Sequence, residues 1–332
     1  MRAIVRQSYG GPEQLVIQEV PEPIPAAGHV VIEVKAFGLN HAEIYFRKGL
    51  WGEVAPVSGI ECVGVVKSDP DGRFEPGTQV LALMGGMGRS FAGSYAQLVR
   101  VPSSNVAAVD TSLPWEELAA LPETYATAWT CLNRNLRLAA GQVLLVRGGT
   151  SALGQAAVNI AAAAGARVLA TTRNPARASG LQKLGADSAL IECADLSVRL
   201  RQLAPQGIDA VLELVGTATL LDSLAAVRPD GRVCMAGFLG GQAPIAAFDP
   251  LLHLPSGVHL SFFASAFTYG NPDYPLSDIP FQTIVDRARQ GVYRASPARV
   301  FRFEEIQEAH RLMESNAANG KIVVLAPALE RI

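Results

Sequence analysis

The stretch Val143–Arg177, VLLVRGGTSALGQAAVNIAAAAGARVLATTRNPAR, decides the fold of this chain. It opens with the apolar run Val143–Val146, which has the length and composition of a buried strand. After a glycine-containing turn, an alanine-rich segment from Gln155 to Ala164 stops at Gly165, a residue type that often ends a helix. The β-branched run Arg167–Thr172 follows. This order predicts strand, turn, helix and strand at the spacing of a parallel crossover unit.

The turn GGTSALG between the first strand and the helix has the chemistry of a phosphate site. Backbone N–H groups at a helix start, together with the positive end of the helix dipole, favour an anion. Its pattern departs from GxGxxG because Ser151 stands where a glycine is common, and its hydroxyl could bond a phosphate oxygen. The residues expected to hold the phosphates are Gly148, Thr150, Ser151, Ala152, Leu153 and Gly154. The alternative is a plain turn whose glycines only permit tight packing.

The end of the second strand predicts which dinucleotide binds. NAD-binding folds usually place Asp or Glu there to hold the ribose 2′-OH, but the segment Thr172–Arg177 contains no carboxylate. It contains two arginines, and a guanidinium suits bidentate recognition of a phosphate. We therefore expect Arg173 and Arg177 to bind the 2′-phosphate of NADP(H), with Thr172 also in the cofactor site. The alternative is two solvated arginines at a helix start.

Composition limits the class of protein. The chain has 332 residues, with 49% hydrophobic and 17% charged side chains, which predicts two globular domains. A net charge of −2 gives no electrostatic reason to expect nucleic acid or an acidic membrane as a partner. Four scattered cysteines form no CxxC pair, which argues against a cysteine-based zinc site and a disulfide framework. No signal peptide or apolar run of about 20 residues is evident, so the cytoplasm is the expected location.

The pattern along the chain predicts an α/β protein with a β-rich part and a doubly wound parallel sheet. Residues 1–120 read as strands and turns, and no helix of length is expected before Trp115. From Leu121 onward, strand and helix patterns alternate. Six strands are expected in this part, at Val143–Val146, Arg167–Thr172, Ser188–Ile191, Ile208–Val215, Arg232–Ala236 and His259–Ala264. The connection before the last strand reads as loop.

The predicted strand ends give further cofactor candidates, because open α/β sheets bind ligands outside the carboxyl ends of their strands. Gly216, Gly237 and Phe238 lie at such ends. After residue 266 the pattern predicts helices at Phe281–Gln290 and Phe303–Glu314, and strands at Arg299–Arg302 and Lys321–Leu325. This tail is expected to return to the first domain. The predicted boundaries are 1–121, 122–265 and 266–332.

Several segments in order carry a family resemblance. They are GLNHAEIYFRKG at Gly38–Gly49, PVSGIECVG at Pro56–Gly64, PETYATAW at Pro122–Trp129, the turn above, and GKIV at Gly320–Val323. The first matches GxNxxDxxxRxG with Glu43 in place of Asp. Together they resemble the medium-chain dehydrogenase/reductase superfamily, and within it the zinc-free quinone oxidoreductase branch that includes zeta-crystallin. The resemblance covers nearly the whole chain.

The resemblance implies a GroES-like catalytic domain, split in sequence around a Rossmann domain that binds NADP(H). It also implies a homodimer in which the strand at His259–Ala264 pairs across a twofold axis. Alcohol dehydrogenases of the superfamily have a cysteine and a histidine as zinc ligands where this chain has Asn40 and Ile60. An amide and an aliphatic side chain do not form a usual zinc site, so no metal is expected.

The resemblance also assigns roles to four side chains, and each has a structural alternative. Tyr45 is expected to donate a hydrogen bond or a proton to the substrate; otherwise it is a packed aromatic. Asn40 holds the nicotinamide ribose or the substrate oxygen; otherwise it is a turn residue. Thr127 lies against the nicotinamide, or bonds its own helix backbone. Lys321 helps to close the cofactor cleft, or is a solvated charge at a strand end.

Three functions agree with this sequence. The leading one is NADPH-dependent reduction of a quinone by hydride transfer without zinc. The second keeps the cofactor and reduces an α,β-unsaturated carbonyl (an enone) or an enoyl thioester. The third is a non-catalytic NADPH-binding protein, against which the joint presence of Tyr45, Asn40 and Thr127 counts.

Overall fold

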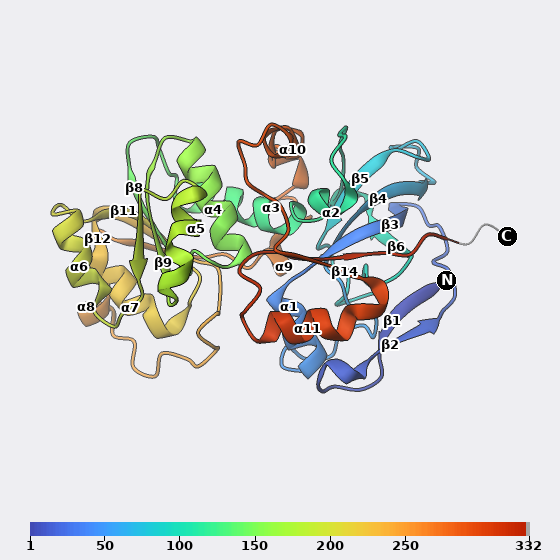
Figure 1. The fold of residues 1–332 in the computed structure, drawn as a ribbon, viewed down its shortest axis with the longest axis horizontal. Helices are drawn as coiled ribbons and strands as arrows, with labels where there is room; N and C mark the ends of the chain where they lie inside the picture. Colours follow the sequence, from blue (N-terminus) through green and yellow to red (C-terminus); the bar gives the residue numbers. More distant parts are fainter. Residues whose placement is uncertain (330–332) are drawn as a thin grey trace. The chain divides into compact units, whose positions relative to one another are not determined.

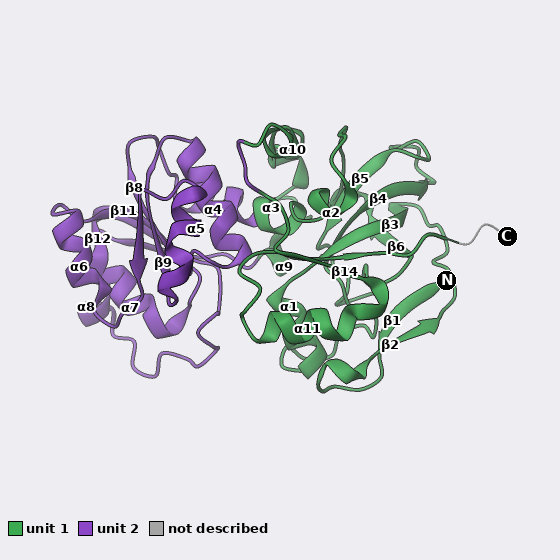
Figure 2. Ribbon diagram, in the orientation of Figure 1, with its two compact units in different colours: residues 1–126, 265–291, 295–332 green, residues 127–264, 292–294 purple. Residues whose placement is uncertain are grey.

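The computed structural model describes residues 1–329, which form two compact units (Figure 2). Unit 1, in green, comprises Met1–Ala126, Ser265–Gly291 and the chain from Ala295 onward. Unit 2, in purple, comprises Thr127–Ala264 and the short segment Val292–Arg294. The chain therefore enters unit 2 twice, the second time only for residues 292–294, and returns to unit 1 each time. The sequence predicts domain boundaries after residues 121 and 265.

Unit 1 is built on a seven-stranded sheet in the order β14-β15-β3-β4-β5-β7, with β6 paired to β3 (Figure 1). Strands β1 and β2 form a separate antiparallel pair. The strands are β1 (Arg2–Arg6), β2 (Leu15–Glu19), β3 (His29–Leu39), β4 (Glu61–Ser68), β5 (Gln79–Leu83), β6 (Leu98–Pro102), β7 (Val106–Ala108), β14 (Arg299–Arg302) and β15 (Ile322–Leu325). Strand β15 pairs antiparallel with β3, with Val323 opposite Gly38. The last strand of the chain thus lies beside one of the first.

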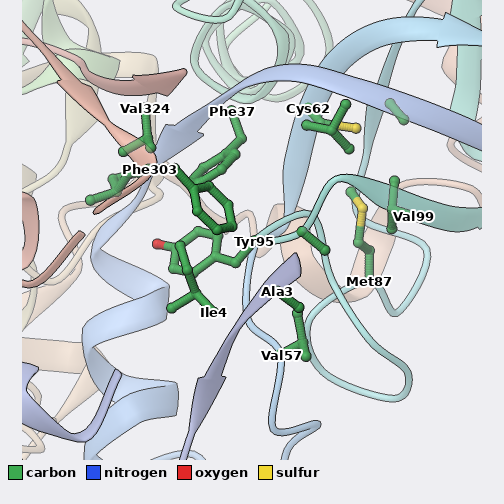
Figure 3. Close-up of a cluster of buried hydrophobic side chains, with 14 of the residues drawn as sticks. Ala3, Ile4, Phe37, Val57, Cys62, Met87, Tyr95, Val99, Phe303 and Val324 are labelled. Carbon is green, nitrogen blue, oxygen red and sulfur yellow. The ribbon is translucent and has the colours of Figure 1, made fainter. Parts of the chain in front are cut away.

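Aromatic side chains fill the centre of the unit 1 core (Figure 3). The ring of Phe37 stacks on that of Tyr95 with centroids 4.7 Å apart, and Phe303 meets Phe37 edge-on at 6.4 Å. Such offset and edge-on pairs add to the stabilisation from buried area. Because Phe37 comes from β3 and Phe303 from the C-terminal segment, this core joins the two ends of the chain.

The sequence predicts no helix of length before Trp115, but the structure has an eight-residue helix there. Helix α1 spans His41–Lys48 and ends at Gly49, which is left-handed with a φ of +72°. At its start, the carboxylate of Glu43 accepts a hydrogen bond from the backbone N–H of Asn40 at 2.6 Å. An Asn followed three residues later by Glu is a helix-start signal, and the sequence reading overlooked it.

Unit 2 holds the predicted doubly wound sheet. Its six strands are all parallel, in the order β10-β9-β8-β11-β12-β13. They are β8 (Val143–Arg147), β9 (Arg167–Thr172), β10 (Ser188–Ile191), β11 (Ile208–Glu213), β12 (Val227–Met235) and β13 (His259–Phe262). The longer helices are α4 (Ala152–Ala163), α5 (Ala178–Lys183), α6 (Leu196–Leu203) and α7 (Thr217–Ala226). The predicted fold class is confirmed.

The remaining helices are short or connect the units. They are α2 (Trp115–Leu118), α3 (Pro122–Thr130), α8 (Pro250–His253), α9 (Ser265–Thr268), α10 (Phe281–Arg289) and α11 (Ile306–Glu314). Helix α8 is a single turn in the connection that the sequence read as loop. Within residues 1–329, every helix is too short or too polar to cross a lipid bilayer.

Candidate functional site

The turn after β8 is tied to the neighbouring strand β9. The N–H of Gly148 donates to the Thr171 hydroxyl at 2.9 Å, and that of Gly149 donates to the Thr171 carbonyl at 3.0 Å. Gly148 has a φ of +89°, a conformation that favours glycine. A Cβ on Gly154 would lie 2.5 Å from the Gly148 carbonyl oxygen, so helix α4 can approach the turn only with glycine here.

Ser151 caps helix α4. Its hydroxyl donates to the Gly148 carbonyl at 2.9 Å and accepts the Gly154 N–H at 3.0 Å. The hydroxyl hydrogen is therefore already used inside the turn. A phosphate oxygen would have to replace the bond to Gly148 in order to accept it, so Ser151 acts first as a cap.

The same turn leaves backbone donors for an anion. Among residues 1–329, the N–H groups of Thr150, Ala152 and Leu153 have no hydrogen-bond acceptor. They belong to the turn and to the first residues of α4, where the helix dipole is positive. This donor set fits the pyrophosphate of a dinucleotide.

The arginines predicted to read the 2′-phosphate lie just beyond β9. Arg173 is exposed and has no ion-pair or hydrogen-bond partner in the described part of the chain. Arg177 is partly buried, at the end of the 3-10 turn Pro175–Arg177. Thr172 is buried, and its hydroxyl bonds the backbone of Asn174. Arg173 is therefore available for a ligand, whereas Thr172 shapes the loop.

The other predicted cofactor residues of unit 2 lie at the ends of β11 and β12. The N–H of Gly216 donates to the Glu213 carboxylate at 3.0 Å, and Gly216 has a φ of +103°. A Cβ on Gly237 would lie 2.6 Å from the Leu214 carbonyl oxygen. Phe238 meets Phe262 edge-on with ring centroids 5.9 Å apart. These glycines allow the two loops to pack closely.

In unit 1, a buried carboxylate gathers the polar residues. Lys321 forms an ion pair with Glu61, and its ammonium also donates to Asn40 Oδ1 at 2.7 Å. Asn40 Nδ2 donates to Glu61 Oε1 at 2.9 Å, and the backbone N–H of Glu123 donates to Glu61 Oε2 at 2.8 Å. We call these four residues the Glu61 cluster. The side chain of Glu61 is 0% exposed and that of Lys321 is 5% exposed, so Lys321 is not a solvated strand-end charge.

The Glu61 cluster fixes the orientation of Asn40, because each end of its amide has a charged partner. One N–H of this amide remains for a ligand. Sequence reasoning did not include Glu61 among the site residues, although it is the Glu of the segment PVSGIECVG. Its role depends on Lys321, which lies 260 residues away in sequence.

Gly38 leaves the space that the Glu61 cluster occupies. A Cβ on this residue would lie 2.4 Å from Lys321 Cε and 2.5 Å from Glu61 Oε1. Its φ is not positive, so the requirement for glycine is steric and does not come from the backbone conformation. This explains the first glycine of the motif that begins at residue 38.

Tyr45 projects from helix α1 and stacks on Trp51, with ring centroids 4.8 Å apart and planes inclined by 28°. Partial burial raises the pKa of the Tyr45 phenol. The phenol therefore stays protonated at neutral pH and can serve as a hydrogen-bond donor. Helix α1 and the stack on Trp51 hold the ring of Tyr45.

A buried series of hydrogen-bonded polar side chains begins on helix α1. Arg47 Nε donates to His310 Nδ1 at 3.4 Å, so the neutral His310 carries its proton on Nε2, which contacts the Tyr95 hydroxyl at 3.0 Å. Burial, followed by the charge of Arg47, lowers the pKa of His310 to about 3. Burial raises the pKa of Glu43 to about 8. Arg47 lies on α1, so this series holds the helix that carries Tyr45.

Thr127 lies on α3, one turn after Glu123, and is buried. Glu61 therefore binds the start of the helix that carries Thr127. Thr127 belongs to unit 2, whereas Asn40 and Tyr45 belong to unit 1. The role of Thr127 stays a prediction.

The residues at the expected zinc positions do not suit a metal. Asn40 is held by Glu61 and Lys321, and Ile60 is a buried aliphatic side chain. Cys62 is buried in the core, where burial raises the pKa of its thiol well above the usual range. Among residues 1–329, no group of three or more His, Cys, Asp or Glu side chains is arranged to hold a metal ion. This donor set does not fit zinc.

Comparison with known proteins finds two family matches. Residues 26–111 match the alcohol dehydrogenase GroES-like domain, and residues 152–274 match the family described as zinc-binding dehydrogenase. The 2-haloacrylate reductase of a Burkholderia species is 27% identical over 99% of both chains. The quinone oxidoreductase of Lama guanicoe is 25% identical over 98% of this chain and 97% of its own.

Larger proteins and solved structures also match. The squalestatin tetraketide synthase clz2 of Cochliobolus lunatus is 26% identical over 91% of this chain, which spans only 12% of that synthase. The structure of an NAD-dependent alcohol dehydrogenase is 28% identical with a TM-score of 0.84, over 98% of this chain and 100% of its own. A mycobacterial protein complexed with NADPH is 25% identical with a TM-score of 0.85, over 98% and 99%.

Proposed function

Because the chain belongs to the medium-chain dehydrogenase/reductase superfamily, in its zinc-free branch, we propose that it reduces quinones with NADPH by hydride transfer. Membership makes the chain an oxidoreductase with a Rossmann-type site for a nicotinamide cofactor. The quinone substrate and the choice of NADPH are our proposal. When bound, the nicotinamide supplies the hydride. The protein binds the cofactor, orients the acceptor and stabilises the negative charge that forms on its oxygen.

The observation that carries this proposal is the Glu61 cluster. Asn40 stands at one of the two positions where zinc-dependent members have a metal ligand, and Glu61 and Lys321 hold its amide with one N–H left over. Hydride addition to a quinone places negative charge on an oxygen, which hydrogen-bond donors stabilise. Asn40 and the protonated phenol of Tyr45 are such donors. Tyr45 would also supply the proton that completes the reduction.

The proposed preference for NADPH depends on the loop after β9. Arg173 is exposed and unpaired among the described residues, and a guanidinium binds a phosphate bidentately. The free N–H groups of the GGTSALG turn would hold the pyrophosphate. The similarity to a mycobacterial protein that is complexed with NADPH agrees with this choice.

A second candidate keeps the site and changes the acceptor to an α,β-unsaturated carbonyl or an enoyl thioester. It is favoured by the similarity to a 2-haloacrylate reductase over nearly the whole chain. Hydride then goes to the β-carbon and a proton to the α-carbon, so Tyr45 serves either reaction. A non-catalytic NADPH-binding protein is the third candidate.

The deciding experiment is NADPH oxidation by the purified protein after dialysis against a chelator, with quinones and enones as acceptors and NADH in parallel. We expect turnover with quinones and a preference for NADPH. Turnover with enones alone would move the function to the second candidate. Tight NADPH binding without turnover would favour the third, and stoichiometric zinc that survives dialysis would contradict a metal-free reaction.

We also propose a homodimer through the edge strand β13. Leu260 and Phe262 on this strand are 40% and 56% exposed, although they are apolar. An exposed apolar edge strand is suited to pairing with a second copy. Light scattering of Phe262→Asp should then show a monomer, whereas wild-type protein should show a dimer. A monomeric wild-type protein would refute the proposal.

A further inference from the structure

Unit 2 contains a buried arginine at the end of β8, immediately before the GGTSALG turn. The side chain of Arg147 is 1% exposed. Its Nε donates to Glu192 Oε1 at 3.0 Å and to Oε2 at 3.2 Å, and Nη2 also pairs with Glu192. Its Nη1 donates to Asp222 Oδ2 at 2.8 Å and to the hydroxyl of Ser223 at 3.1 Å. One guanidinium thus holds two carboxylates.

Glu192 follows β10 and lies beside the end of β9, the strand end where dinucleotide folds usually read the ribose. Strand β10 runs beside β9 with Ile191 opposite Thr172, and the N–H of Glu192 donates to the Thr172 carbonyl at 3.0 Å. Strand β9 lies between β10 and β8 in the sheet. The ion pair from Arg147 to Glu192 therefore links the carboxyl ends of the two strands that flank β9. In dinucleotide folds an acid at the end of this second strand holds the ribose 2′-OH.

The sequence reading found no carboxylate at this end because it followed β9 alone. The fold supplies one from the neighbouring strand. A carboxylate here accepts a hydrogen bond from a 2′-OH but repels a 2′-phosphate. Glu192 is 13% exposed, and both of its oxygens are engaged by Arg147. The guanidinium therefore reduces the negative charge of Glu192 beside the end of β9.

We propose that Glu192 is a specificity-determining residue for the dinucleotide and that Arg147 is the positioning residue that restrains it. Glu192 opposes the 2′-phosphate, and Arg147 limits this opposition by neutralising and holding the carboxylate. Arg173 and Arg177 then act against a reduced negative charge. The inference uses the cofactor site of the proposed function, but it concerns the ratio of two affinities and holds whichever dinucleotide the wild type prefers.

The test compares Glu192→Gln with Asp222→Asn. Both substitutions remove one negative charge and one ionic partner of Arg147, but only Glu192 lies beside the end of β9. Affinities are measured by calorimetry with NADPH, NADH, 2′,5′-ADP and 5′-AMP, so the readout needs no turnover. We expect Glu192→Gln to raise the preference for the 2′-phosphorylated ligand at least threefold, and Asp222→Asn to leave it within about twofold. The increase should shrink as salt screens the charge.

Arg147→Lys gives a prediction of opposite sign, because lysine keeps the charge but loses the fork on Glu192. Its preference for 2′,5′-ADP over 5′-AMP should fall at least threefold. An unchanged or lower ratio in Glu192→Gln, or an equal increase in Asp222→Asn, would overturn the proposal. A wild-type preference for NADH would contradict only the proposed choice of NADPH, since the shift in Glu192→Gln would still point toward the phosphorylated ligand.

Discussion

Gly38→Ala should break the Glu61 cluster without altering any of its side chains. The added Cβ would lie 2.4 Å from Lys321 Cε and 2.5 Å from Glu61 Oε1, well inside van der Waals contact. Both groups must move, although Lys321 and Glu61 are 5% and 0% exposed. Breaking a buried ion pair costs about 3–5 kcal/mol. We expect a loss of about 3 kcal/mol, because both charges stay in the protein and can partly pair again.

The assay is urea unfolding combined with hydrogen exchange, because two units need not unfold in one transition. Amides of β3 and β15 in unit 1 should lose protection, while those of β8 and β9 in unit 2 keep theirs. Gly180→Ala is the matched control. A Cβ there meets nothing within 4 Å and lies in helix α5, so it should stabilise by up to about 1 kcal/mol. Unchanged protection of β15 in Gly38→Ala would refute the steric argument.

Gly38→Ala also tests whether the cluster serves function. If Asn40 must be held by Glu61 and Lys321, turnover should fall at least tenfold in folded Gly38→Ala protein, with a smaller effect on NADPH affinity. Wild-type turnover in a protein whose ion pair is broken would show that the cluster only stabilises unit 1.

Three further perturbations separate the proposed roles. Tyr45→Phe keeps the stack on Trp51 and should lower turnover about 10²-fold with little loss of stability. Intact turnover on every acceptor would show that Tyr45 is not a donor in the reaction. Arg173→Ala with Arg177→Ala should reduce the NADPH over NADH preference at least tenfold, and an unchanged preference would rule out the phosphate clamp. Glu43→Gln should flatten the loss of stability as the pH rises toward 8. Because folding raises the pKa of Glu43 from 4.5 to about 8, its contribution is present below pH 4.5 and is lost as the pH rises toward 8, by at most about 1.4 kcal/mol per pH unit. Urea midpoints of wild type and variant that decline equally between pH 5 and 8 would contradict this.

Local signals explain why unit 2 was predicted well. Its strands are short apolar runs separated by helices, and the structure keeps Arg167–Thr172 and Ser188–Ile191 as strands with the predicted ends. Such periodicity needs only neighbouring residues. Helix α1 was missed because His41–Lys48 is short and lies among strands, so its Asn–Glu start signal carried too little weight.

The candidate site could be predicted only where one segment contains the chemistry. The GGTSALG turn and the two arginines are of this kind. Glu61 and Lys321 are 260 residues apart, and Arg147 and Glu192 are 45 apart. Such pairs form only when strands from distant segments have paired. Neither the composition nor the periodicity of one segment predicts them. A single sequence could supply Glu61 and Lys321 separately, but not the bond between them.

The two buried ion pairs, Glu61–Lys321 and Arg147–Glu192, have the same physical role. Each ion pair removes charges from water, which costs free energy. Folding alone does not require this cost, since apolar residues of similar size often stabilise a core equally well. Each also lies beside a group proposed to contact ligand, namely Asn40 in unit 1 and the end of β9 in unit 2. A charge held by several short bonds does not reorganise when a ligand arrives, so its field acts fully on the bound state. On this reasoning, replacing Glu61 and Lys321 together by apolar residues should preserve the fold of unit 1 while abolishing turnover. Retained turnover in a folded double variant would show that the field of this ion pair is not what the reaction needs.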